Sequence, residues 1–127
     1  MDAVRRPIVV KLKMTGGQVV QGCDVYIGRQ QSQGGWRLKK SEWCNRFTLK
    51  VHGDKCIELF KEELYEKVRN DPDTWIPKLV ALEGLTIGCW CHPLPCHGNV
   101  IADLVVKVCE AERSEEAGDA WVKEMWG

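Results

Sequence analysis

The chain has 127 residues, of which 44% are hydrophobic and 28% charged, and its formal net charge at pH 7 is zero. These values are typical of one soluble globular domain, and no apolar run approaches the roughly 20 residues that a membrane span needs. No apolar signal core follows the first residues, so we expect a cytoplasmic or nuclear, reducing compartment. The seven cysteines are then free thiols or metal ligands rather than disulfides.

The charge is distributed unevenly along the chain. Residues 1–50 carry ten lysines and arginines against three acidic residues, a net charge of +7, and residues 51–127 carry −7. A basic half can contact nucleic acid or a phosphorylated ligand. Alternatively, the two halves complement each other within one molecule or between subunits.

Two strands are predicted in the first part of the chain. Residues 7–13 are apolar and then alternate, which predicts a strand. Gly16 and Gly17 end it, and a second strand is expected within residues 19–27. Residues 30–42 are polar, and we expect an exposed loop there.

Three helices and a buried strand are predicted in the remainder. Apolar residues recur at helical spacing up to residue 69, with Asp54 as the N-cap. A second helix is expected from a cap at Asp73 to about residue 83, followed by Gly84 in the left-handed conformation. Residues 85–90 carry no charge and predict a central strand. A long helix begins at about residue 98.

This order of elements predicts an α/β fold, with about three or four strands in a small layered sheet packed with helices. We assign residues 1–112 to a single domain. Residues 113–127 contain a charged break and a C-terminal tail that carries Trp121 and Trp126. Since exposed indoles are costly in water, we expect the tail to dock on its own domain or on a second copy. We favour a homodimer.

The most informative segment is residues 88–98, which read G-C-W-C-H-P-L-P-C-H-G. Thiolate and imidazole are ligands that zinc prefers. Strand alternation places the first two cysteines on one face, and the proline-containing turn can return the third cysteine and the second histidine towards them. The zinc ligands expected are Cys89, Cys91, Cys96 and His97, with His92 as a substitute.

The same residues allow two other interpretations. In a metal-free site, Cys96 is a nucleophile and His97 or His92 the acid or base. Cysteine also packs as a small hydrophobic residue, which we expect for Cys89 inside the strand. Packing is also the expectation for the remaining cysteines, Cys23, Cys44, Cys56 and Cys109.

The position of this segment favours a binding site. Ligands of open α/β sheets lie beyond the carboxyl ends of the strands, and the unpaired N–H groups of the following helix can hold an anion. Arg29 follows the second strand. If the strands are parallel, its guanidinium reaches the same edge and can bind a phosphate or carboxylate. The alternative for Arg29 is a surface ion pair.

Three segments carry a family resemblance. They are D-V-Y-I-G-R at residues 24–29, S-E-W-C-N-R-F at 41–47, and L-E-G-L-T-I-G-C-W-C-H-P-L-P-C-H-G at 82–98. Together they resemble the domain of unknown function 4326 of bacteria, phages and large DNA viruses, over about residues 8–108. The second segment departs from the family pattern, with Glu42, Cys44 and Arg46 in place of Pro, Gly and Pro.

The resemblance implies a phage or viral context, in virus-infected cells or virions, and brings no settled activity. The site residues that it indicates are Arg29, Trp43, Asn45, Cys89, Cys91, Cys96, His97 and Gly98.

Our leading hypothesis is a nucleotide- or nucleic-acid-binding module. Arg29, Trp43, Asn45 and Gly98 are the expected ligand-binding residues, with a base stacked on Trp43 or Trp36 and a zinc ion at the Cys/His turn. The expected partner is an anionic small molecule or nucleotide. The basic segment 37–40 would contact nucleic acid only weakly, and no membrane partner is expected.

Two rival functions remain open, and the sequence does not decide whether the protein is an enzyme. The first is an enzyme acting on a nucleoside, nucleotide or related metabolite through Cys96 and His97 or a zinc-bound water. The second is a structural, dimeric accessory protein.

Overall fold

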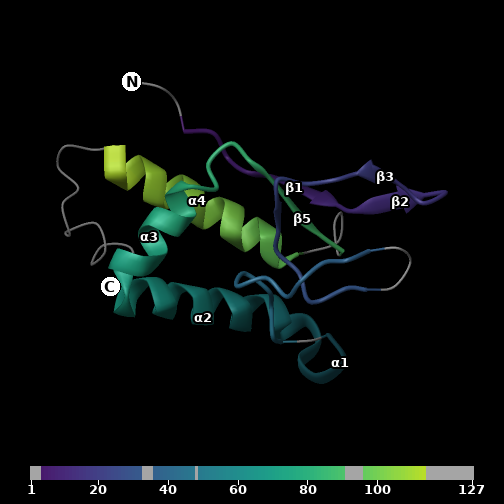
Figure 1. Ribbon diagram of the computed structural model, residues 1–127. Helices are drawn as coiled ribbons and strands as arrows, with labels where there is room; N and C mark the ends of the chain where they lie inside the picture. Colours follow the sequence, from purple (N-terminus) through teal and green to yellow (C-terminus); the bar gives the residue numbers. More distant parts are fainter. Residues whose placement is uncertain (1–3, 33–35, 48, 91–95, 114–127) are drawn as a thin grey trace.

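The computed structural model describes residues 4–32, 36–47, 49–90 and 96–113 (Figure 1). Its centre is a three-stranded parallel sheet of β1 (Ile8–Lys11), β5 (Thr86–Cys89) and β4 (Val25–Tyr26), in the order β1-β5-β4. The predicted α/β class is therefore confirmed. The position of β5 in the centre also agrees with the expectation from its uncharged sequence.

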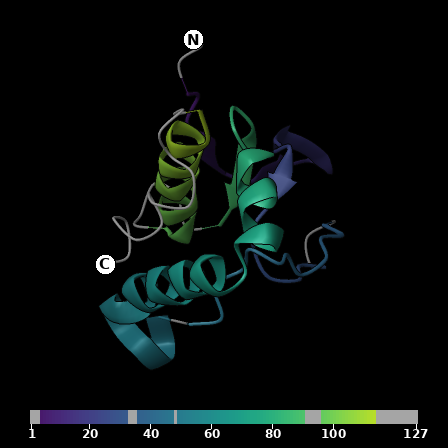
Figure 2. The ribbon, with the colours of Figure 1, turned by 90° about the vertical axis from the view of Figure 1, so that its left-hand side faces the viewer.

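A separate hairpin follows β1. Strands β2 (Lys13–Thr15) and β3 (Gln18–Gln21) pair antiparallel. Gly16 and Gly17 have φ angles of +59° and +78° and form the two-residue turn between them, a conformation that glycine adopts without steric cost. In Figures 1 and 2 the hairpin projects away from the helices.

The second predicted strand, residues 19–27, is in fact divided between these two sheets. Its first part is β3 of the hairpin, and only β4 joins the parallel sheet. Asp24 holds β4 beside β5, because its N–H donates to the Thr86 carbonyl at 2.8 Å and its carboxylate accepts from the Thr86 N–H at 2.8 Å. Residues 22–24, between β3 and β4, belong to neither strand.

The helices begin differently from the prediction. A short helix α1 (Leu49–His52) and a 3-10 turn (Gly53–Lys55), neither of them predicted, precede α2 (Cys56–Asn70). The N-cap of α2 is Lys55, so Asp54 is not the cap.

The next helix also starts earlier than expected. Helix α3 (Pro72–Val80) is capped by Asp71 rather than Asp73, because proline is well suited to the first helical position. Gly84, with a φ of +73°, has the predicted left-handed conformation. Helix α4 (His97–Arg113) is the long helix after the Cys/His segment.

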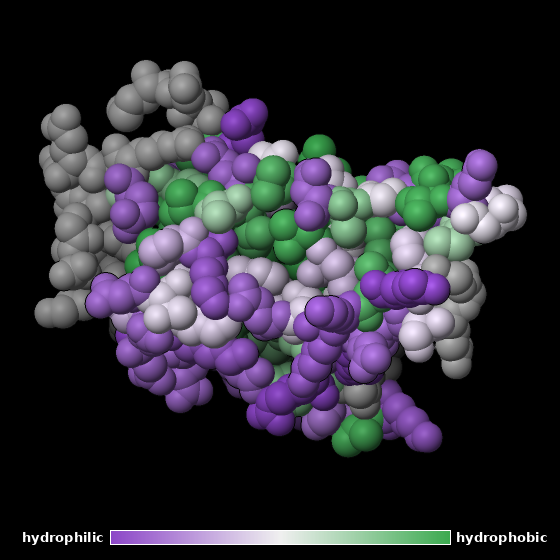
Figure 3. All heavy atoms as spheres, in the orientation of Figure 1, coloured by the Kyte–Doolittle hydropathy of each residue, from purple (hydrophilic) through white to green (hydrophobic). Residues whose placement is uncertain are grey.

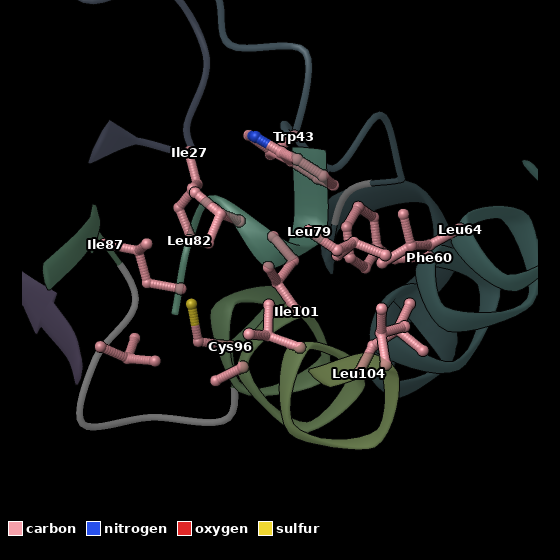
Figure 4. Packing of buried hydrophobic residues seen from close by; sticks show 14 of the residues in the cluster. Ile27, Trp43, Phe60, Leu64, Leu79, Leu82, Ile87, Cys96, Ile101 and Leu104 are labelled. Carbon is pink, nitrogen blue, oxygen red and sulfur yellow. The ribbon is translucent and has the colours of Figure 1, made fainter. Parts of the chain in front are cut away.

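The helices form a second layer on one side of the sheet (Figures 1 and 2). Helix α4 packs against β1 and β5, and α3 contacts both α2 and α4. The core between the layers is apolar, and Figure 4 shows part of it. The residues labelled there are Ile27, Trp43, Phe60, Leu64, Leu79, Leu82, Ile87, Cys96, Ile101 and Leu104.

The hydropathy of the surface differs between α2 and the hairpin. Hydrophilic side chains cover α2 at the lower left of Figure 3. On β3, Val19 and Val20 are 55% and 60% exposed. No helix within the described ranges is both long and apolar enough to cross a membrane.

Candidate functional site

The carboxyl ends of the three parallel strands meet at one edge of the sheet. Tyr26 pairs with Gly88, and the Ile27 N–H donates to the Gly88 carbonyl at 2.9 Å. Arg29 and Trp90 therefore both follow strands that end at this edge. The parallel arrangement that the sequence argument required is present.

A compact Cys/His cluster lies where β5 ends and α4 begins. The Sγ atoms of Cys89 and Cys96 are 2.8 Å apart, and Cys96 Sγ is 3.8 Å from His97 Nδ1. Both cysteines are only 1% exposed. The structure thus brings together three of the predicted ligands, whereas Cys91 and His92 lie outside the described residues.

The two described thiols are closer together than two cysteine ligands of one zinc ion. Zinc–sulfur bonds of about 2.3 Å in tetrahedral geometry hold two sulfurs about 3.8 Å apart, whereas Cys89 and Cys96 are 2.8 Å apart. Within the described part of the chain, no group of three or more Cys, His, Asp or Glu side chains is placed to hold a metal ion. Zinc therefore stays an expectation from the sequence.

His97 joins α4 to the end of β4. Its Nε2 donates to the Ile27 carbonyl at 2.7 Å, and its ring meets Phe60 edge-on at 5.0 Å. Burial lowers the pKa of His97 below 6.5, an effect only partly opposed by the bond to Ile27. Since a carbonyl only accepts, the neutral ring carries its proton on Nε2, and the Nδ1 lone pair faces Cys96.

Two of the first amide groups of α4, those of Gly98 and Asn99, have partners within the chain. The Gly98 N–H donates to Cys96 Sγ at 3.3 Å, and the Asn99 N–H donates to the Cys96 carbonyl at 3.0 Å. Cys96 therefore acts as the N-cap of the helix. Its sulfur occupies the place that the sequence argument gave to an external phosphate.

Gly98 lies at a close contact between α4 and the sheet. A Cβ at this position would be 2.9 Å from both Ile27 Cδ1 and Val9 Cγ1. The absence of a side chain therefore lets the helix approach the strands, which explains this glycine without a ligand.

Arg29 and Asn45 hold the chain between β4 and α2. The Arg29 guanidinium donates to the Asn45 carbonyl at 2.9 and 3.2 Å and to the Phe47 carbonyl at 3.3 Å. Asn45 accepts from the Phe47 N–H at 2.9 Å and donates to the Cys56 carbonyl at 3.2 Å. Much of the hydrogen-bonding capacity that the sequence analysis reserved for a ligand is therefore used internally.

Trp43 is part of the core. It is 4% exposed, and its ring meets Trp75 edge-on at 5.5 Å. A base cannot stack on Trp43 in this arrangement. Trp36, the other tryptophan considered from the sequence, is half-buried.

Three half-buried rings, which we call the aromatic cluster, lie at the same edge: Tyr26, Trp36 and Trp90. Trp90 Nε1 donates to the Tyr26 hydroxyl at 2.7 Å, and the Trp36 and Trp90 centroids are 5.3 Å apart with the rings nearly perpendicular. The Tyr26 hydroxyl donates in turn to the Arg29 carbonyl. Burial raises the pKa of Tyr26, so its proton is retained for this bond.

Sequence reasoning did not find this cluster, because it depends on the register between two strands. Tyr26 pairs with Gly88, and residues two apart along a strand share a face. Trp90 therefore lies on the Tyr26 side, opposite Cys89. Only the register between β4 and β5 makes this relation visible.

Exposed cations, which we call the basic edge, lie where β1 ends and in the segment that follows Trp36. Lys11 and Lys13 flank the end of β1, and Lys11 pairs in register with Cys89. The segment after Trp36 is held to the chain that follows β4 by an antiparallel bridge between Gln31 and Leu38 and by a Ser41 N–H bond to the Gly28 carbonyl. The basic edge consists of Lys11, Lys13, Arg37, Lys39 and Lys40. None of these five cations forms an ion pair with a described carboxylate.

The fold and site define a small two-layer α/β domain with a Cys/His strand-to-helix turn at the carboxyl edge of a parallel sheet. The chain belongs to the family described as a domain of unknown function (DUF4326), whose model matches residues 10–107. The resemblance found in the sequence is thereby confirmed.

Two viral proteins are similar to this chain. Uncharacterized protein R718 of Acanthamoeba polyphaga mimivirus is 40% identical over 109 residues, which cover 77% of this chain and 78% of that protein. An uncharacterized 12.4 kDa protein from the nrdA-td intergenic region of Enterobacteria phage T4 is 38% identical over 52 residues, covering 41% and 47%. These relatives fit the context of a virus-infected cell. No solved structure matches the chain.

Proposed function

We propose that this protein is a nucleotide-binding module in which the aromatic cluster stacks the base and the basic edge binds the phosphate. The observation that carries the proposal is the position of Tyr26, Trp36 and Trp90 at the carboxyl edge of the sheet. Trp36 is followed in the chain by exposed cations that have no ionic partner in the described residues. The carboxyl edge is where open α/β sheets bind ligands.

The rings suit a planar ligand because they are both accessible and oriented. Trp36 and Trp90 are half-buried, so part of each indole faces solvent. The Trp90 N–H is fixed by the Tyr26 hydroxyl at 2.7 Å, which reduces the entropy lost on binding. Stacking of one base on such a ring contributes about 1–3 kcal/mol.

The basic edge contributes modestly to the binding affinity through electrostatic attraction of the phosphate. Arg37, Lys39 and Lys40 are exposed and directly follow Trp36 in the chain. Three phosphate contacts give a salt slope of about −2 for a single strand. We therefore expect affinity to depend more on stacking than on charge, which favours a nucleotide or a short single strand over a long duplex.

The test is a calorimetric titration of the full chain with adenosine monophosphate, a thymidine oligonucleotide and inorganic phosphate. We expect the two base-containing ligands to bind and phosphate alone to bind much more weakly. Trp36→Ala should weaken nucleotide binding by about 5- to 150-fold, the equivalent of one stacked base, and Trp36→Phe should recover part of it.

Two charge variants provide a matched comparison. Lys39→Ala with Lys40→Ala removes two exposed cations of the basic edge, whereas Lys50→Ala with Lys55→Ala removes one exposed cation in α1 and one in the 3-10 turn that follows it. Only the first pair should reduce affinity and the salt slope. Binding that is unchanged in Trp36→Ala, or equal binding of phosphate and nucleotide, would contradict the proposal.

A further inference from the structure

We propose that Cys89 and Cys96 are a peroxide-oxidisable thiol pair that closes to an intramolecular disulfide between the end of β5 and the start of α4. The proposal does not depend on nucleotide binding. It begins from the contact between the two sulfurs, which is too short for two ligands of one zinc ion.

The two thiols are already paired by rigid elements. Cys89 ends the central strand β5, and Cys96 caps α4. Their Sγ atoms are 2.8 Å apart, about 0.8 Å more than the length of a disulfide bond. Bond formation therefore requires only a small movement, and little chain entropy is lost in bringing the sulfurs together.

The environments of the two sulfurs give them different roles. Cys96 Sγ accepts the Gly98 N–H at 3.3 Å and lies at the N-terminus of a 17-residue helix. Both features stabilise negative charge on the attacking sulfur. Cys89 lies at the carboxyl end of β5 rather than at the start of a helix. We therefore assign Cys96 as the attacking residue and Cys89 as the resolving residue.

The reaction has two balanced steps with hydrogen peroxide as the oxidant. Cys96 sulfur attacks one peroxide oxygen, the O–O bond breaks, and the products are Cys96 sulfenic acid and water. Cys89 sulfur then attacks the Cys96 sulfur and displaces its hydroxyl group, which leaves as a second water with the Cys89 proton. The two sulfurs are oxidised and peroxide is reduced.

Because the thiol pair is buried, its oxidation can be distinguished from the oxidation of more exposed cysteines. Cys89 and Cys96 are each 1% exposed, whereas Cys23 and Cys44 are half-buried. Peroxide is scarcely larger than water, but a maleimide is much larger. In the folded protein a maleimide should label Cys23 and Cys44 first, whereas peroxide should oxidise the buried pair first.

The disulfide would also affect the aromatic cluster. It closes a ring of residues 89–96, which contains Trp90. Since Trp90 contacts Tyr26 and Trp36, oxidation should change its fluorescence. Comparison of Trp90→Phe with the unchanged chain identifies that contribution.

The experiment treats the full-length chain with hydrogen peroxide, blocks the remaining thiols and maps the peptides by mass spectrometry. We expect a peptide pair joined through Cys89 and Cys96, lighter by two hydrogen atoms and separated by dithiothreitol. Cys44→Ser, the control, should leave the product unchanged. Cys89→Ser should stop the reaction at Cys96 sulfenic acid, which dimedone traps.

Three results would overturn the proposal. The first is a cross-link that uses Cys91 or Cys23 instead of the pair. The second is dimedone capture on Cys89 in the Cys96→Ser variant, with none on Cys96 in the Cys89→Ser variant. The third is stoichiometric zinc in the purified protein that prevents oxidation. Peptide mapping of the unchanged chain decides the first result, and elemental analysis of the same chain together with that mapping decides the third. A failure of a serine variant to fold therefore leaves the test intact.

Discussion

Gly98→Ala tests whether this glycine serves packing or a ligand. The substitution adds one methyl group at the start of α4. Its Cβ would lie 2.9 Å from Ile27 Cδ1 and 2.9 Å from Val9 Cγ1, two side chains that are 0% and 7% exposed. Neither neighbour can turn towards solvent, so α4 must move away from the sheet.

The expected loss of stability follows from two opposing effects. Overpacking of a core by one methyl group costs about 1–3 kcal/mol, and alanine gains up to about 1 kcal/mol over glycine in a helix. The gain is smaller in the first turn. The net loss is about 1–2 kcal/mol, which lowers Tm by about 3–10 °C for a domain of this size.

Thermal unfolding followed by circular dichroism measures this change. Gly22→Ala is the matched control, because its added Cβ meets only Val19 Cγ1 at an ordinary 3.5 Å, and its effect should remain within about 0.5 kcal/mol. An unchanged or raised Tm for Gly98→Ala, together with weaker nucleotide binding, would refute the packing argument and restore the ligand-binding role expected from the sequence.

Three further predictions concern other parts of the molecule. Arg29→Ala should lower the free energy of unfolding by about 1–3 kcal/mol in urea titrations, because charged hydrogen bonds to the Asn45 and Phe47 carbonyls are lost; a stable variant with weaker ligand binding would contradict this. Because burial lowers the folded-state pKa of His97 below 6.5, the unfolded chain takes up the proton first, so the stability present above pH 6.5 should fall as the pH is lowered through that value. His97→Gln, which can still donate to the Ile27 carbonyl, should show a smaller fall. The C-terminal tail lies outside the described residues, and its predicted self-association is tested by light scattering on the full chain and on one ending at Glu112, where two monomers would exclude it.

The fold was predictable where a pattern depends on one element alone. The uncharged run of β5 and the apolar spacing of α2 and α4 report burial directly, so these elements were placed correctly. The hairpin was not predicted, because β3 and β4 share one apolar, β-prone run. Their separation depends on long-range pairing with β2 and β5, which the local sequence does not contain.

The site was predictable as a location and less so in its contacts. The prediction that Arg29 and the Cys/His turn share one sheet edge agrees with the parallel pairing of β4 and β5. The partners of Arg29 are backbone carbonyls, and these are the same in every sequence. Residue types therefore cannot show that the guanidinium and the first amides of α4 are used internally.

The described residues of the closing motif of the family, which spans residues 88–98, differ in what they contact. Gly88 allows Leu12 and Cys23 to cover the sheet, with a Cβ there only 2.7 Å from either side chain. Gly98 allows α4 to approach the sheet on its other face, and His97 connects that helix to Ile27. These three residues form a joint between β5 and α4.

The packing roles of Gly88, Gly98 and His97 do not explain the presence of Trp90 or of the thiol pair. Trp90 is half-buried rather than part of the core, and its N–H is directed to Tyr26 at the sheet edge. Cys89 and Cys96 are buried in the core as small hydrophobic residues are, yet their sulfurs are in contact. The packing at the end of β5 places Trp90 on one face of the sheet and the two thiols on the other. Chemistry in this motif is therefore to be sought first at Trp90, Cys89 and Cys96, and only then at the glycines and the histidine.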